Sequence, residues 1–114
     1  SIHQQIMFAE KSWGSFRVLD VEDASMTIKI TLTPGHGMNY HSHENRDEVW
    51  TVISGTGHAI LDGVRRDVKA GDILTMPAGC RHTVFADSEL KIIEVQLGPA
   101  ISVEDKQKYP LPQA

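Results

Sequence analysis

Two histidines of the sequence, His41 and His43, stand two positions apart. On an extended backbone this spacing places both imidazoles on the same face. Glu48 follows at the start of a β-branched and aromatic run, and His82 comes much later, just after a Pro-Ala-Gly turn. Three neutral imidazoles and one carboxylate suit a divalent metal ion such as zinc, iron, manganese, nickel or copper. We therefore expect one metal centre, which in octahedral geometry would keep two positions open for water or substrate.

The segments around these residues have the pattern of short strands. Apolar runs are separated by Gly, Pro and Asp at intervals of roughly 8–12 residues, which is typical of a β-sandwich or barrel. Strands are expected at residues 26–32, 48–53, 58–61, 64–68, 73–76, 81–85 and 90–97. The run 48–53 is expected to be buried on both faces, and Asp62-Gly63 predicts a type I′ hairpin. Residues 103–114 are polar and contain prolines, which indicates a short helical turn or a loose tail.

The length and charge of the chain narrow the possible functions. We expect a single domain over residues 1–114, with a core at about 13–98 between an N-terminal arm and a C-terminal tail. The net charge of −4 argues against nucleic acid or an anionic membrane as the main partner. No apolar run is long enough to span a bilayer, and Cys80, the only cysteine, cannot form an internal disulfide. The cytoplasm is the expected location, and a small molecule is the expected partner.

Two groups of residues match the motifs of one known family. The first group surrounds the paired histidines with glycines: Gly35, His41, Ser42, His43, Glu48 and Gly55. The second group is Gly71, Pro77, Ala78, Gly79 and His82. Together they resemble the two cupin motifs, although Ala86 stands where the family often has Asn. The resemblance implies an all-β fold, the cupin double-stranded β-helix, which is a jelly-roll-like barrel of two antiparallel sheets. It also implies that the three histidines and the glutamate bind the metal.

A longer set of residues narrows the resemblance to one branch of the cupin superfamily. The set runs from about Trp13 to Gly98 and includes residues 13–16, Arg46, residues 48–50, residues 62–63 and residues 93–98. It is similar to the C-terminal cupin of type II mannose-6-phosphate isomerases, a domain usually fused to a mannose-1-phosphate guanylyltransferase. This resemblance implies isomerisation between an aldose and a ketose sugar phosphate. The metal would polarise the oxygens at C1 and C2 while a base moves a proton through an enediol.

The chain departs from that branch at several positions. His41 replaces a common Gln, Thr83 replaces an Arg, Ile28 replaces a Lys, and the C-terminal Tyr-Gly-Arg ending is absent near Tyr109. The replaced basic residues are the ones that a phosphate group would need. The remaining candidates to bind it are Lys29, Arg46 and Arg81. Arg46 is the best of these, because it lies in the loop between the first-motif ligands.

The role of Glu94 depends on the direction of one strand face. Glu94 and Gln96 alternate with Ile93, Val95 and Leu97. If the polar face points into the barrel, Glu94 is a candidate general base. If that face points to solvent, Glu94 is an ordinary polar residue on an exposed strand face. No residue that could activate Cys80 as a nucleophile is identifiable in the sequence. We therefore expect Cys80 to be a small buried residue and not a nucleophile.

Three functions remain open at this point. The first is a metal-dependent isomerase that acts on a sugar or sugar phosphate, and the second is an iron-dependent dioxygenase, which His41 favours. The third is a non-catalytic module that binds a small molecule, because one fold hosts many chemistries. The strands near 49–53 and 92–97 are more apolar than one barrel interior requires, so we expect a homodimer with an isologous interface.

Overall fold

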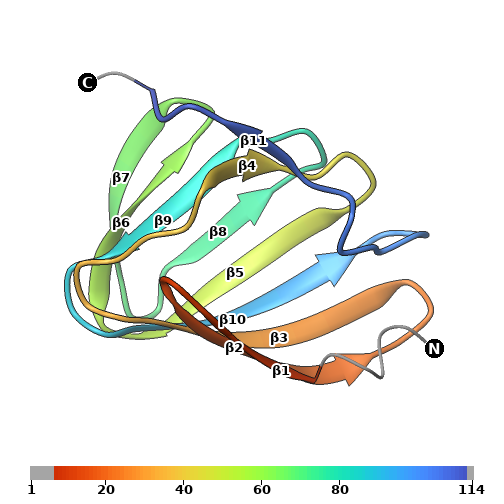
Figure 1. Ribbon diagram of the computed structural model, residues 1–114, viewed down its shortest axis with the longest axis horizontal. Helices are drawn as coiled ribbons and strands as arrows, with labels where there is room; N and C mark the ends of the chain where they lie inside the picture. Colours follow the sequence, from red (N-terminus) through yellow and green to blue (C-terminus); the bar gives the residue numbers. More distant parts are fainter. Residues whose placement is uncertain (1–6, 113–114) are drawn as a thin grey trace.

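The computed structural model describes residues 7–112, which contain strands and no helix (Figure 1). The strands are β1 (Phe8–Lys11), β2 (Gly14–Val21), β3 (Ser25–Leu32), β4 (Tyr40–Ser42), β5 (Asp47–Ser54), β6 (Thr56–Leu61), β7 (Val64–Lys69), β8 (Ile73–Met76), β9 (His82–Ala86), β10 (Leu90–Leu97) and β11 (Gln107–Tyr109). The all-β fold predicted from the sequence is confirmed. No helix within the described residues is long and apolar enough to cross a membrane.

The strands form two antiparallel sheets that face each other across one core (Figure 1). The larger sheet has the order β1-β2-β3-β10-β5-β8, and the smaller sheet has the order β11-β4-β9-β6-β7. The two motif regions thus meet across the barrel, because β4 and β9 belong to the smaller sheet and β5 to the larger one.

Apolar side chains from the inner faces of both sheets form the core. The best-buried members are Ile30, Leu32, Trp50, Val52, Leu74, Val84, Leu90 and Ile92. Strand β5 shows why the expectation of burial on both faces was wrong. Trp50 and Val52 are buried, whereas Ile53 is 48% exposed. Only the inner face of the larger sheet packs against another layer, so alternate residues of β5 point outward.

The hairpin predicted at Asp62-Gly63 is confirmed. Both residues have positive φ, 46° at Asp62 and 81° at Gly63, as a type I′ turn requires. Strands β6 and β7 pair directly across it, with Leu61 opposite Val64. Asp62 Oδ1 also accepts a hydrogen bond of 2.9 Å from the backbone N–H of Arg81, next to the start of β9.

The C-terminal segment differs from the prediction. Part of it forms β11, an edge strand of the smaller sheet, in place of a helical turn or loose tail. β11 pairs with β4 and places Lys108 opposite His41. The Tyr109 hydroxyl lies 2.8 Å from Ser42 Oγ, and the Arg81 guanidinium stacks 3.8 Å from the centre of the Tyr109 ring. Residues 113–114 of the predicted tail and 1–6 of the predicted arm lie outside the described residues.

Candidate metal centre

The structure brings the four predicted ligands together. His41 lies on β4, His43 directly follows that strand, Glu48 lies on β5, and His82 begins β9. His41 and His82 are register partners on neighbouring strands. All four side chains are buried, with exposed fractions between 1% and 6%. The site is therefore held by regular strands of both sheets.

The ligand atoms converge at short distances. The ring nitrogens offered by the three histidines lie within 4.8 Å of one another. Glu48 Oε2 is 3.2 Å from His43 Nε2, and Glu48 Oε1 is 3.5 Å from His82 Nε2. These three buried histidines could hold a metal ion, and the Glu48 carboxylate beside them could add an oxygen donor.

Hydrogen bonds to the backbone orient all three imidazoles. The bonds are His41 Nδ1 to Asn39 O at 2.6 Å, His43 Nδ1 to Asp105 O at 2.6 Å, and His82 Nδ1 to Cys80 O at 3.0 Å. A carbonyl oxygen only accepts, so each Nδ1 carries the proton and each Nε2 keeps a lone pair. Within residues 7–112, the buried Nε2 of His82 has no hydrogen-bond partner. A buried imidazole nitrogen that has no hydrogen-bond partner and faces the other donor atoms fits the role of a metal ligand.

Burial sets the charge state of the ligands. It lowers the pKa of His41 from 6.5 to about 3, with the neighbouring His82 as the next cause. It also lowers the pKa of His43, although the charge of Glu48 opposes the shift. Burial would raise the pKa of Glu48, but the contacts with His82 and His43 and the Arg46 guanidinium hold it well below its usual range. At neutral pH His41 and His43 are thus neutral imidazoles and Glu48 is a carboxylate, as metal binding requires.

Comparison with known proteins places the chain in a family. A model of the Cupin domain matches residues 28–96, more than half of the chain. The chain belongs to the cupin family.

Curated relatives of this cupin include an alginate biosynthesis protein and a mannose-1-phosphate guanylyltransferase. It is 27% identical over 101 residues to the alginate biosynthesis protein AlgA of Pseudomonas putida, a match that covers 87% of the chain and 21% of the relative. It is 24% identical to the mannose-1-phosphate guanylyltransferase of Klebsiella pneumoniae, over 83% of the chain and 21% of the relative. The chain thus spans about one fifth of the length of these relatives. They confirm the resemblance predicted from the sequence.

A solved structure supports the same fold. The structure of KdgF from Halomonas sp. superposes with a TM-score of 0.77 at 18% identity, and the match covers 86% of this chain and 92% of that one. At this identity the likeness shows the double-stranded β-helix fold alone.

Arg46 lies inside the cupin site, in contact with the ligands. Its Nε donates to Glu48 Oε2 at 2.8 Å, its Nη1 donates to Ser102 O at 3.1 Å, and its Nη2 lies 3.2 Å from His43 Nε2. Since a guanidinium only donates, that His43 nitrogen accepts, in agreement with its lone pair. Most donors of Arg46 are therefore engaged within the protein.

The strand face that carries Glu94 points into the barrel. Glu94 and Gln96 are each 4% exposed, and Leu97 on the opposite face is 43% exposed. Gln96 Nε2 donates to Glu94 Oε2 at 2.6 Å. Burial, followed by the nearby charge of Glu48, raises the pKa of Glu94 well above its usual value. The raised pKa favours the protonated form of Glu94, as a proton donor beside the candidate ligands requires.

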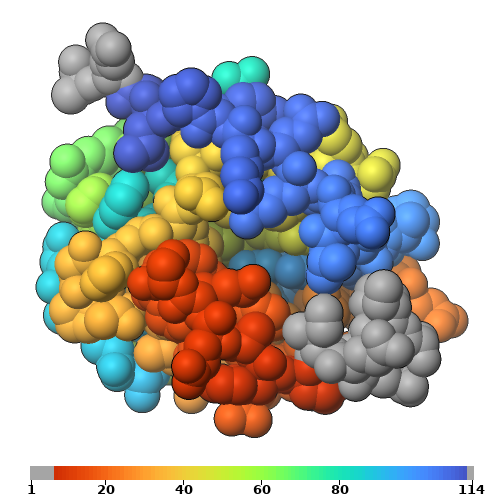
Figure 2. Space-filling view, viewed as in Figure 1, coloured from red at the N-terminus to blue at the C-terminus, as the bar shows by residue number. Residues whose placement is uncertain are grey.

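A cavity of about 540 Å³ opens from the ligands to the surface. Its apolar wall comes from β2, β3 and the segment before them: Trp13, Phe16, Val18, Met26, Ile28 and Ile30. Its rim includes the C-terminal strap, which we define as residues 101–109, and Lys11. In Figure 2 the blue C-terminal segment and the red N-terminal strands lie on the same face of the molecule.

Two of the predicted cations lie elsewhere. Lys29 alternates with the inward-facing Ile28 and Ile30 on β3 and does not line the cavity. Arg81 stacks on Tyr109.

Burial, followed by the charge of Asp62, raises the pKa of Cys80 to about 11, which fits an unreactive thiol.

Sequence reasoning missed the strap entirely. Asp105 binds the His43 imidazole through its backbone carbonyl, and its carboxylate accepts bonds of 2.9 Å from the backbone N–H groups of Glu44 and Asn45. Lys106 and Lys108 line the cavity. Residues 106–108 are all polar, so no alternation of apolar and polar residues marks the short strand.

Proposed function

We propose that this cupin binds one divalent metal ion with His41, His43, Glu48 and His82 and uses it to act on a sugar or sugar phosphate. The observation that carries the proposal is the set of three imidazoles whose Nδ1 atoms are fixed by carbonyls and whose Nε2 atoms face one another beside a carboxylate. This arrangement leads directly into a cavity large enough for a monosaccharide derivative.

The residues of the cavity suit an aldose–ketose isomerisation. When bound, the metal would supply a Lewis acid for sugar oxygens. Glu94 would give a proton to the aldose carbonyl oxygen as the enediol forms and regain one from the C2 hydroxyl as the ketose forms, while Gln96 would hold its carboxyl group in place. The transfer of the C2 proton to C1 would require a separate base. Trp13 and Phe16 offer apolar surface against which a sugar ring can pack and from which water is excluded. The matches to mannose-1-phosphate guanylyltransferases support a sugar derivative as substrate.

An iron-dependent dioxygenase is the second candidate. Its support is the ligand set itself, three histidines and one glutamate, together with the apolar wall that includes Ile28 at the position of the missing lysine. A third outcome, a non-catalytic binding module, would use the same cavity without chemistry.

Metal analysis of protein purified without added metal separates these candidates. Zinc would favour the isomerase, iron would favour the oxygenase, and intact protein without metal would favour the binding module. A coupled assay that converts mannose 6-phosphate to fructose 6-phosphate, with zinc, manganese, iron or nickel supplied, then tests the isomerase directly. Inactivity with every metal would contradict the isomerase proposal.

We also propose a homodimer formed by the outer face of the larger sheet. Ile53, Ile73 and Leu97 on this sheet are exposed by 48%, 58% and 43%. Val49 and Val95 lie opposite each other on β5 and β10, and both are half-buried. Light scattering at tens of micromolar should give twice the mass of one chain. A monomer there would contradict the dimer.

Two smaller expectations accompany this proposal. Because both sheets share one core, we propose that residues 1–114 form a single domain, which should unfold in one cooperative transition. Because Cys80 is a free buried thiol, we propose the cytoplasm as the location.

A further inference from the structure

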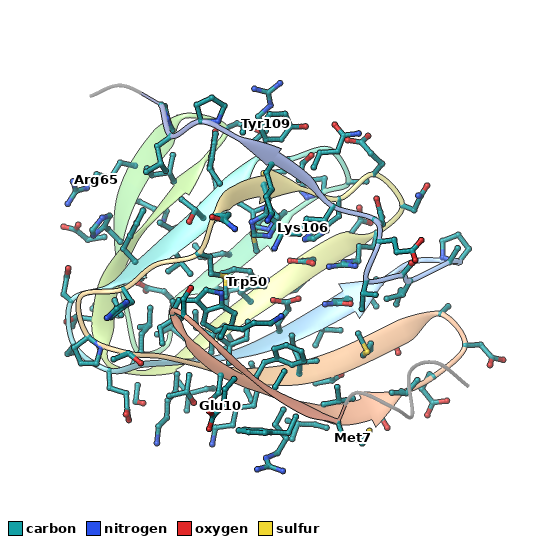
Figure 3. All side chains as sticks on the ribbon, viewed as in Figure 1. Met7, Glu10, Trp50, Arg65, Lys106 and Tyr109 are labelled. Carbon is teal, nitrogen blue, oxygen red and sulfur yellow. The ribbon has the colours of Figure 1, made fainter. Side chains whose placement is uncertain are left out.

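Three lysines from distant parts of the chain meet at the rim of the cavity. Lys11 ends β1, whereas Lys106 and Lys108 belong to the strap, and all three line the cavity that contains the metal ligands. Figure 3 shows Lys106 extending from the strap across the barrel mouth in the direction of Trp50, which lines the same cavity. The rim is therefore strongly cationic although the chain carries a net charge of −4.

These lysines have no ion-pair partner among residues 7–112, unlike Lys69 and Lys91. Lys69 pairs with Asp72 at 3.4 Å, and Lys91 pairs with Glu89 at 3.7 Å. Lys106 is close enough to the other rim lysines for repulsion to count: burial lowers the pKa of Lys106, and the charges of Lys108 and Lys11 lower it further. Like charges held together without a carboxylate are destabilising, so an unpaired group of them favours an anionic ligand.

The acidic groups of the cavity do not neutralise this rim. Glu48 is engaged by Arg46 and the neighbouring histidines, and Glu94 is bonded to Gln96 and has a raised pKa that disfavours its charged form. Glu104 also lines the cavity, but it forms no ion pair with a described lysine.

The strap holds its two lysines in place through its other residues. β11 pairs with β4, the Asp105 carboxylate binds two backbone N–H groups, and Tyr109 bonds to Ser42. Lys106 and Lys108 are two apart at the strand, so both can point to the same side. The charges are thus positioned by the fold and do not belong to a free tail.

We propose that Lys11, Lys106 and Lys108 form an anion-binding subsite that holds a phosphate or carboxylate group of the substrate while the rest of the molecule reaches the metal centre. The subsite replaces Arg46 in the role that the sequence suggested for it, since Arg46 donates to Glu48 and Ser102. The inference rests on the proposed function in so far as both use the same cavity, but it concerns binding and requires no turnover.

Calorimetric titration of the full-length, zinc-loaded protein tests the subsite. The probes are mannose 6-phosphate, glucuronate and neutral mannose, and the variants are Lys106→Gln/Lys108→Gln, Lys11→Gln and, as a matched control outside the cavity, Lys91→Gln. We expect at least one anionic sugar to bind about tenfold more tightly than mannose, with an advantage that shrinks at high salt. The preferred anion identifies the group as phosphate or carboxylate.

The double variant should lose that advantage, whereas its affinity for mannose and its zinc content stay unchanged. Lys11→Gln should lose part of the advantage and Lys91→Gln none. Equal binding of all three sugars by the wild type, or an equal loss in Lys91→Gln, would overturn the subsite. Anion binding that depends on Lys106 and Lys108 in a protein without isomerase activity would support the subsite and contradict the isomerase.

Discussion

The ligand strands and the C-terminal strap contribute to the metal centre in different ways. The strands β4, β5 and β9 supply the buried donor atoms and lie within the two sheets. The strap supplies no donor to the four-residue set, but it fixes one imidazole, closes one side of the cavity and carries two of the rim lysines. The barrel thus determines which atoms are available, whereas an edge strand determines how one of them is oriented. The four predictions below test this division.

The largest effect should follow from removal of a ligand on a central strand. Replacement His82→Ala removes the orphaned Nε2 that faces the other donors, and a site with three of four ligands retains little affinity. We expect loss of bound metal by elemental analysis. His58→Ala is the matched control, because His58 lies on neighbouring β6, stacks on Phe85 and does not line the cavity. Equal metal content in both variants would show that His82 is no ligand.

A smaller effect should follow from damage to the strap at Asp105. Asp105→Ala removes the carboxylate that anchors the strap to the Glu44 and Asn45 N–H groups, so the carbonyl that orients His43 loses its fixed position. Loss of such an orienting contact typically weakens metal binding by roughly 10–100-fold. Competition with a chelator measures this, and Glu104→Ala serves as the neighbouring control. A wild-type affinity in Asp105→Ala would mean that the central strands orient His43 alone.

The buried histidines predict an acid-sensitive stability of the metal-free protein. The unfolded chain protonates His41 near pH 6.5, whereas the folded chain does so only near its pKa of about 3. The unfolded state therefore binds more protons between these values, and stability falls as pH decreases. His41 alone should lower the free energy of unfolding by about 2 kcal/mol between pH 7 and pH 5. Urea denaturation at both pH values measures the difference, which His41→Gln should reduce.

The pKa of Glu94 is shifted so that this residue changes stability with pH in the opposite direction to His41. It therefore provides a control for that measurement. Its raised pKa means that the folded state keeps a proton that the unfolded state releases, so Glu94 lowers stability as pH rises above its ordinary value. Glu94→Gln should remove this opposing contribution and steepen the gain in stability towards pH 8. An unchanged pH profile would place Glu94 outside the buried set.

The smallest effect is expected at the end of the strap. Tyr109→Phe keeps the ring on which Arg81 stacks and removes the hydroxyl, which bonds to Ser42 and donates an exposed hydrogen bond of 3.2 Å to Gln107 Oε1. The free energy of unfolding should fall by about 1 kcal/mol, because water can replace the exposed bond to Gln107 and the part-buried bond to Ser42 accounts for most of the loss. Metal affinity should change by less than about threefold, since Asp105 keeps its own anchors. A loss as large as that of Asp105→Ala would show that the whole strap acts as one cooperative unit.

The same division explains what the sequence could predict. The ligand set was accessible because each member stands next to turn residues with fixed spacing, and β8 was predicted with the bounds that it has. Strands β1, β2, β4 and β11 were missed. β4 and β11 have only three residues each, which is too few for a periodic pattern. The Asp105 contact was missed because it runs through a backbone carbonyl, an atom that every residue has.

At one position the sequence could not show which face of a strand points into the barrel. Alternation placed Glu94 and Ile93 on opposite faces but gave no means to choose which face is inside. A buried carboxyl group is costly, and the usual preference for apolar residues in the interior favours the wrong choice. Register with β5, which puts Gln96 opposite Glu48, settles the direction.

The position of the strap in the chain bears on the order in which the site is completed during synthesis. A ribosome releases all four donors by residue 82 and the larger sheet by residue 97, but Asp105 only afterwards. A nascent barrel can therefore capture a metal ion while the His43 ring still rotates freely, and such an ion would exchange quickly. Docking of the strap would then slow this exchange, so the ion that the site retains would reflect the affinities and concentrations of the available ions at the moment of docking.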